Sequence, residues 1–170
     1  MALSDPFEDG GLGEVLIIDP QDFGSRLMKV MVEDLGCPSA MTADTVADAL
    51  ASLVASDIDL VIVDRRFGMS SIARLLKALR QASDPRFQNI TVLLSTDAAD
   101  RAFVDAIGLI GVDGIVVTPC SARILGERIG AARGIWHRHF ASPPRPRAAY
   151  GKLAPEREIT PTRPTPLPSR

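Results

Sequence analysis

Apolar and polar residues alternate in blocks along the chain between about residues 14 and 133. Five short apolar runs predict β-strands, and several of these runs are continuous rather than alternating. Continuous apolar runs are typical of strands that are buried on both faces of a parallel sheet. The predicted strands are Glu14–Asp19, Ser39–Thr42, Asp59–Asp64, Ile90–Ser95 and Gly114–Thr118.

Apolar residues at helical spacing separate these strands and predict five helices. Asp44 and Ser121 are the predicted N-caps of the second and fifth helices, and Gly36 and Gly111 the predicted stops of the first and fourth. The predicted inward-facing residues, helix by helix, are Leu27, Val30, Met31 and Leu35; Val46, Leu50, Leu53 and Val54; Ile72, Leu75, Leu76 and Leu79; Phe103, Ile107 and Ile110; Ile124, Leu125, Ile129 and Ala132.

Five β/α repeats with short loops predict an α/β fold, a doubly wound parallel sheet with helices on both faces. Ligands of such sheets bind beyond the carboxyl ends of the strands. The first and third predicted strands end in Asp19 and Asp64, and the fourth ends at Ser95–Thr96. The fifth ends in Thr118 and Pro119, where a cis peptide bond would bend the chain sharply.

The order and spacing of these residues resemble the CheY-like receiver domain of two-component response regulators, a flavodoxin-like (βα)5 fold with a five-stranded parallel sheet. The resemblance covers about residues 14–134. It implies that Asp64 is the phospho-acceptor, Thr96 the switch hydroxyl and Asp19 the first residue of an acidic pair. Pro20 stands where the second acid is expected, and Thr118 where Lys is expected.

These two departures bear on the phosphorylation chemistry of the site. A phosphoryl group beside carboxylates needs Mg²⁺ to neutralise the charge, and with Pro20 only Asp19 and Asp64 are left as weak metal ligands. The neutral Thr118 cannot supply the charge of a Lys.

The two Arg residues that follow Asp64 could supply positive charge instead. If Arg65 or Arg66 pairs with Asp64, that carboxylate would stay ionised without a metal. Two interpretations of Asp64 remain open: a vestigial acid in a degenerate receiver, or a working phosphorylation site with unusual metal dependence.

The charge is unevenly distributed along the 170 residues. The net charge is −2, but residues 133–170 carry +6, so the rest of the chain carries −8. A basic tail on an acidic body indicates an anionic partner for the tail, or docking of the tail on the body. The two cysteines, Cys37 and Cys120, fit a reducing compartment, and neither a signal peptide nor a long apolar run is present. We therefore expect a cytoplasmic protein without membrane insertion.

Composition divides the chain into three parts. Residues 1–13 are acidic and Gly-rich and are expected to be flexible, residues 14–134 form the receiver domain, and residues 135–170 form an arginine- and proline-rich tail. This tail is expected to be disordered unless a ligand binds. From residue 133 onward lie the only Trp, the only Tyr, both His and eight of the thirteen Pro.

The tail residues are suited to a ligand that has both bases and phosphates. Arg can fork onto phosphate, pair with guanine and stack on a base, and Trp and Tyr offer further stacking faces. The tail is similar to the arginine-rich extensions of the CheY-like cyclic di-GMP effectors, the Cle family. The residues that carry this similarity are Trp136, Arg138, Arg145, Arg147, Tyr150 and Arg157.

The Cle resemblance implies a non-enzymatic effector. Its tail would bind cyclic di-GMP and control interaction with a protein partner such as the flagellar motor switch. A single-domain response regulator controlled by phosphorylation of Asp64 is the alternative. The tail could also bind polyanions in general, although nucleic acid is not the expected partner, and Trp136 could instead pack an extended last helix onto the body.

Overall fold

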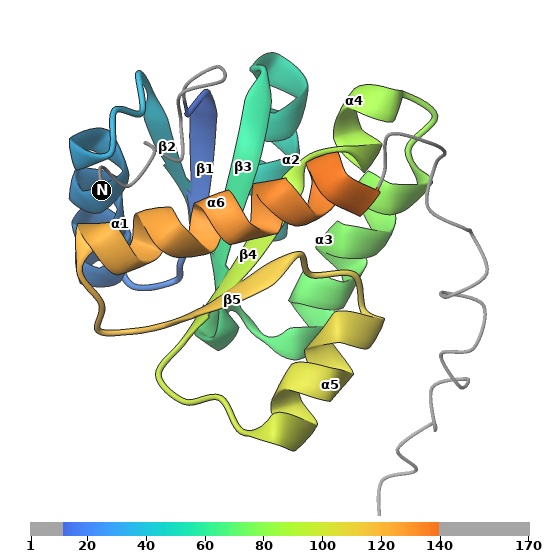
Figure 1. Ribbon diagram of the computed structural model, residues 1–170. Helices are drawn as coiled ribbons and strands as arrows, with labels where there is room; N and C mark the ends of the chain where they lie inside the picture. Colours follow the sequence, from blue (N-terminus) through green and yellow to red (C-terminus); the bar gives the residue numbers. More distant parts are fainter. Residues whose placement is uncertain (1–11, 140–170) are drawn as a thin grey trace, which may run out of the picture.

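The computed structural model describes residues 12–139, with side chains through Gly134. Figure 1 shows a central parallel sheet with helices on both of its faces. The elements in chain order are β1 (Glu14–Ile18), α1 (Asp22–Asp34), β2 (Ala40–Ala43), α2 (Val46–Ala55), β3 (Ile58–Asp64), the 3₁₀ turn η1 (Arg65–Phe67), α3 (Met69–Gln81), α4 (Pro85–Gln88), β4 (Thr91–Thr96), α5 (Arg101–Leu109), β5 (Gly114–Val117) and α6 (Ala122–His139).

The sheet has five strands in the order β2-β1-β3-β4-β5, and all neighbouring strands are parallel. This confirms the predicted α/β receiver architecture. Each observed strand begins and ends within one residue of its predicted range. The strands were predictable because β3 and β4 are almost entirely buried, so their apolar runs are uninterrupted.

Two hydrophobic clusters fill the space between the sheet and its helices. One face of the sheet is covered by α2, α3 and α5, and the other by α1 and α6. In Figure 1, α6 runs across the strands on the second face, with α1 beside it. The predicted inward-facing residues of α3 are all buried, as are Ile107 of α5 and Leu125 and Ile129 of α6.

The predicted inward faces of α1, α2 and α6 are partly wrong, and in α6 it is Ile124 that is exposed, at 37%. Leu27 and Val30 are 48% and 61% exposed, and α1 instead buries Ser25, Met28 and Val32. In α2, Leu50 and Val54 are exposed, while Ala49 and Leu53 are buried. In both α1 and α2 a small side chain, Ser25 or Ala49, is buried while larger apolar side chains are exposed.

The helix ends agree with most of the predicted caps. Gly36 and Gly111 have φ values of 88° and 91°, the left-handed conformation that ends α1 and α5, and the Ser121 hydroxyl accepts a hydrogen bond from the backbone N–H of Ile124. The N-cap of α2, however, is Thr45 and not Asp44, because the Thr45 hydroxyl accepts from the backbone N–H of Asp48. The short elements η1 and α4 were not predicted.

The folded region extends beyond the predicted limits of the receiver domain, residues 14 and 134, at both ends. Leu12, within the predicted flexible segment 1–13, is buried in the cluster under α1 and α6. At the other end α6 continues to His139, so the predicted boundary after residue 134 falls inside this helix. None of the helices in the described part of the chain is long and apolar enough to cross a membrane.

Candidate functional site

The carboxyl ends of β1 and β3 bring Asp19 and Asp64 together. These strands are neighbours, with Ile18 of β1 in register with Val63 of β3, so the next residue of each strand emerges at the same edge. Both carboxylates are largely withdrawn from solvent: Asp19 is 7% and Asp64 5% exposed. Two buried like charges at one edge require a compensating positive group.

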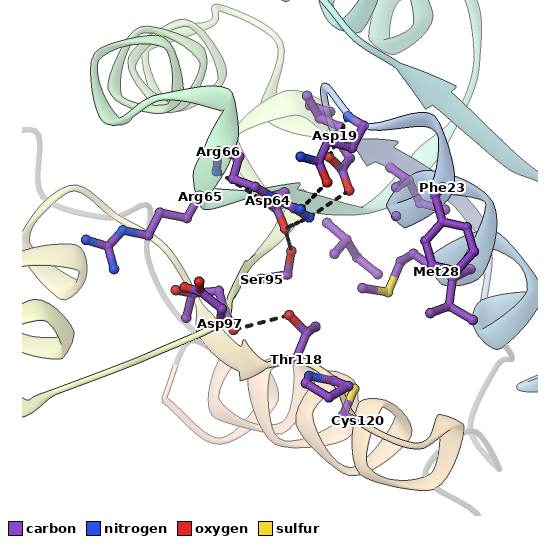
Figure 2. Close-up of a pocket in the computed structure, with 18 of the residues that line it drawn as sticks. Asp19, Phe23, Met28, Asp64, Arg65, Arg66, Ser95, Asp97, Thr118 and Cys120 are labelled. Carbon is purple, nitrogen blue, oxygen red and sulfur yellow. Dashed lines mark hydrogen bonds and ion pairs between the residues drawn. The ribbon is translucent and has the colours of Figure 1, made fainter.

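Arg66 supplies this positive group. It lies in η1, two residues after Asp64, and its side chain turns back over the carboxylates (Figure 2). Its Nε donates to Oδ1 of Asp64 at 2.7 Å and its Nη2 to Oδ2 at 3.1 Å, a bidentate pair. The same Nη2 lies 3.4 Å from Oδ2 of Asp19. One nitrogen of Arg66 therefore contacts both acids.

The carboxylate of Asp64 is saturated with hydrogen bonds. Oδ1 also accepts from the backbone N–H of Arg66 at 2.8 Å, and Oδ2 accepts from the Ser95 hydroxyl at 2.8 Å. Ser95 is in register with Asp64 on the neighbouring strand β4. With the two guanidinium contacts, the carboxylate accepts four hydrogen bonds, about its full capacity.

The two acids differ in how their surroundings affect the pKa. Burial acts to raise the pKa of Asp64, but the hydrogen bonds from Arg66 and Ser95 and the charge of Arg66 outweigh it, so this pKa is lowered. Burial also raises the pKa of Asp19, and the nearby Asp64 adds to the increase. The backbone N–H of Gln21 and the Arg66 charge offset only part of this increase. Arg66 thus favours the ionised form of Asp64 more than that of Asp19.

The first turn of α1 completes the surroundings of the acids. The backbone N–H of Gln21 donates to Oδ1 of Asp19 at 2.8 Å, and the Gln21 side-chain oxygen accepts from Nη1 of Arg66. Gly24 leaves room for this network, since a Cβ added there would lie 2.2 Å from Oδ2 of Asp19. The contact of Gln21 and the space at Gly24 were not anticipated from the sequence.

Thr96 and Thr118 lie at the same edge, but their hydroxyls hydrogen-bond other partners than Asp64. The Thr96 hydroxyl donates to the carbonyl of Ala98 at 2.8 Å, and the Thr118 hydroxyl lies 3.3 Å from the carbonyl of Thr96. The peptide bond between Thr118 and Pro119 is cis, as the sequence suggested. The hydroxyl that reaches Asp64 comes from Ser95, the residue that precedes the expected switch position.

A pocket of about 340 Å³ opens beside the acids, between α1 and the ends of β4 and β5. Its polar wall is formed by Asp19, Asp64 and Arg66, and its apolar wall includes Phe23, Met28 and Cys120 (Figure 2). Arg65 also borders the pocket, but its guanidinium lies over the ring of Phe103, 4.3 Å from the ring centre.

The predicted cyclic di-GMP residues are placed only in part. Trp136 and Arg138 belong to the last turns of α6, with side chains outside the description. Arg145, Arg147, Tyr150 and Arg157 lie outside the described residues. Within the described part of the chain, no group of three or more His, Cys, Asp or Glu side chains could hold a metal ion.

Comparison with known proteins places this chain in a family. No family model matches the chain. However, the chemotaxis protein CheY of Pseudomonas aeruginosa is 33% identical over 117 residues, covering 68% of this chain and 92% of that protein. The chain belongs to the CheY-like receiver family. CheY-3 of Vibrio cholerae is 32% identical over 117 residues, covering 68% of this chain and 88% of that protein.

Solved structures agree with the CheY-like fold. CheY4 of Vibrio cholerae superposes with a TM-score of 0.62 at 19% identity, covering 71% of this chain and 98% of that one. A response regulator of Thermotoga maritima gives a TM-score of 0.61 at 21% identity, covering 72% and 98%. The similarity thus covers the receiver body of this CheY-like protein and leaves about 30% of its chain unmatched.

Proposed function

We propose that this CheY-like protein is a non-enzymatic signalling effector whose arginine-rich tail binds cyclic di-GMP. Binding of the dinucleotide controls the association of the receiver body with a protein partner such as the flagellar motor switch. The body supplies the partner surface, and the tail supplies the signal input.

The observation that carries this proposal is that the carboxylate of Asp64 is already fully hydrogen-bonded. Its carboxylate already accepts four hydrogen bonds, two of them from the Arg66 guanidinium, so it is poorly placed to receive a phosphoryl group. A receiver whose phospho-acceptor is bound in this way needs another source of signal. The residues after α6 offer one, because Arg145, Arg147 and Tyr150 combine phosphate-binding and base-stacking groups within six residues.

The receiver body exposes apolar side chains that suit a partner surface. Val104 and Leu109 of α5 are 41% and 75% exposed, Val117 of β5 is 49% exposed and Ile124 of α6 is 37% exposed. These three elements correspond to the partner face of CheY-like proteins. Because α6 leads directly into the tail, a ligand held by the tail lies close in sequence to this surface.

Calorimetric titration of the full chain with cyclic di-GMP tests the proposal. Arg145→Ala/Arg147→Ala is compared with Arg163→Ala/Arg170→Ala, a control that removes the same charge from the end of the tail. If both Arg145 and Arg147 contact the ligand, we expect the first pair to weaken binding by about 3 kcal/mol or more, roughly a hundredfold or more. The control pair should bind like the wild type.

Three results would overturn the proposal. The first is an absence of binding to the wild-type chain. The second is equal weakening by both pairs, together with a steep salt dependence and no preference for guanine, which would indicate general polyanion binding. The third is unchanged binding in Arg145→Ala/Arg147→Ala.

Control by phosphorylation of Asp64 is the second candidate function, favoured by the position of Asp64 at the carboxyl end of β3 beside Asp19. A phosphoryl mimic added with Mg²⁺ should then shift the amide NMR signals of Asp64 and Ser95. Unchanged signals would count against this function without affecting the cyclic di-GMP proposal.

A further inference from the structure

Arg66 contacts both acids of the pair through one nitrogen. Its Nη2 lies 3.1 Å from Oδ2 of Asp64 and 3.4 Å from Oδ2 of Asp19, so one nitrogen occupies the space between the two carboxylates. A divalent cation shared by these acids would need the same space.

The residues present do not fit Mg²⁺ while Arg66 is there. Mg²⁺ demands near-octahedral oxygen ligands at about 2.0–2.1 Å and retains several waters. Both oxygens of Asp64 already accept hydrogen bonds, and Oδ1 of Asp19 accepts from the backbone N–H of Gln21. A divalent ion would also sit against a guanidinium charge in a partly buried site, where like charges repel strongly.

The position of Arg66 is fixed from several sides. Its backbone N–H and its Nε both bond Oδ1 of Asp64, and its Nη1 donates to the side chain of Gln21 at the start of α1. The absence of a side chain at Gly24 leaves space for Nη2, which lies 3.3 Å from where a Cβ would be. The guanidinium therefore belongs to a built network that joins β1, η1 and α1.

We propose that Arg66 is a built-in cation that replaces the divalent metal of this receiver and closes the Asp19–Asp64 pair to metal binding. The network keeps the two acids bound to Arg66 and free of metal, whatever the concentration of Mg²⁺. This inference concerns the body alone, and it stands or falls independently of cyclic di-GMP binding by the tail.

Removing the guanidinium should open the site to metal. Arg66→Met keeps an apolar stem and removes the guanidinium from between Asp19 and Asp64, and Mg²⁺ is commonly held by one or two carboxylates together with waters and phosphate oxygens. Arg65→Met is the matched control, because Arg65 is the adjacent residue and stacks on Phe103 instead of touching the acids. The double variant Asp19→Asn/Arg66→Met tests whether any new site uses this pair.

The experiment titrates each full-length protein with magnesium chloride and follows the amide NMR signals of Asp19, Asp64 and Ser95. The wild type and Arg65→Met should show no saturable shift, and Arg66→Met should bind at least about tenfold more tightly than either. The gain should disappear in Asp19→Asn/Arg66→Met. Thermal unfolding with magnesium or with chelator gives a second measurement, in which only Arg66→Met is stabilised by the metal.

Two results would overturn the inference. Saturable binding of Mg²⁺ at these residues in the wild type overturns it, and so does an Arg66→Met protein that binds no better than Arg65→Met. If the methionine variant does not fold, Arg66→Gln replaces it, since a neutral amide still donates to Asp64, and the same two outcomes apply.

Discussion

Asp64 shows how a neighbouring residue can reverse the effect of burial on a carboxyl group. Burial disfavours the charged form of an acid, yet the pKa of Asp64 is lowered because Arg66 and Ser95 donate to the carboxylate. Asp19 contacts the same guanidinium through one longer interaction of 3.4 Å, and there burial prevails. The number and geometry of the donors decide which effect dominates.

Arg66→Met should therefore move the pKa of Asp64 from below its ordinary value of 3.8 to above it. Burial would then act without the main opposing donor. Carbon-13 NMR titration of the Asp side-chain carboxyl groups measures the change, with Arg65→Met as the control. A value that stays below 3.8 in Arg66→Met would show that Ser95 and the backbone N–H suffice to hold the charge.

The same change should alter the pH dependence of stability. In the wild type the folded pKa of Asp64 is lowered, so its contribution is present above the unfolded pKa and lost as the pH falls through the folded pKa. In Arg66→Met the raised pKa of Asp64 makes its ionised form destabilising, so that protonation of Asp64 stabilises the fold. Denaturant unfolding at several pH values should show that the difference in the free energy of unfolding between the two proteins is largest near neutrality and becomes smaller in acid. A constant difference would contradict this linkage.

Helix α1 has apolar residues on more than one face, and only one face contacts the sheet. Val32 is completely buried, whereas Val30, two residues earlier, is 61% exposed. Val32→Ala should lower the free energy of unfolding by about 2 kcal/mol, since it removes methyl groups and leaves a cavity. Val30→Ala makes the same chemical change and should stay within about 0.5 kcal/mol of the wild type. Equal losses in urea unfolding would show that Val30 is also packed.

The elements differ in how well the sequence predicts them. The strands were predictable because burial on both faces leaves continuous apolar runs, and α3 because its four buried residues form one stripe. The inward face of α1 was not predictable, because the small polar Ser25 is buried while the larger apolar Leu27 is 48% exposed. Sequence spacing gives the period of a helix but does not say which of two apolar faces meets the sheet.

The acid site was predictable in its positions but not in its contacts. The ends of adjacent strands predict the positions of Asp19 and Asp64, and the two Arg residues after Asp64 indicate a pairing partner for it. Which Arg it would be depends on η1, which directs Arg66 back to the acids and Arg65 toward Phe103. The bond from Ser95 depends on the register of β3 and β4, which a single sequence does not reveal.

At the scale of the whole molecule, both hydrophobic clusters of the described part of the chain lie between Leu12 and Ala132. A chain that ends after His139 retains all of α6 and both hydrophobic clusters. Its free energy of unfolding in urea should therefore lie within about 1 kcal/mol of that of the full chain. A substantially larger loss would show that the tail packs against the body, and would redirect the search for its role to that contact.

Arg66 lies two residues after Asp64 in the chain, and this location affects how the acid site responds to dissolved cations. A cation attached to the same short turn is present at an effective concentration that a dissolved ion must outcompete. Unlike a metal, it cannot be depleted by chelation, exchanged for another ion or diluted. Under this proposal the positive charge beside the pair is encoded in the polypeptide and does not depend on the supply of divalent cations.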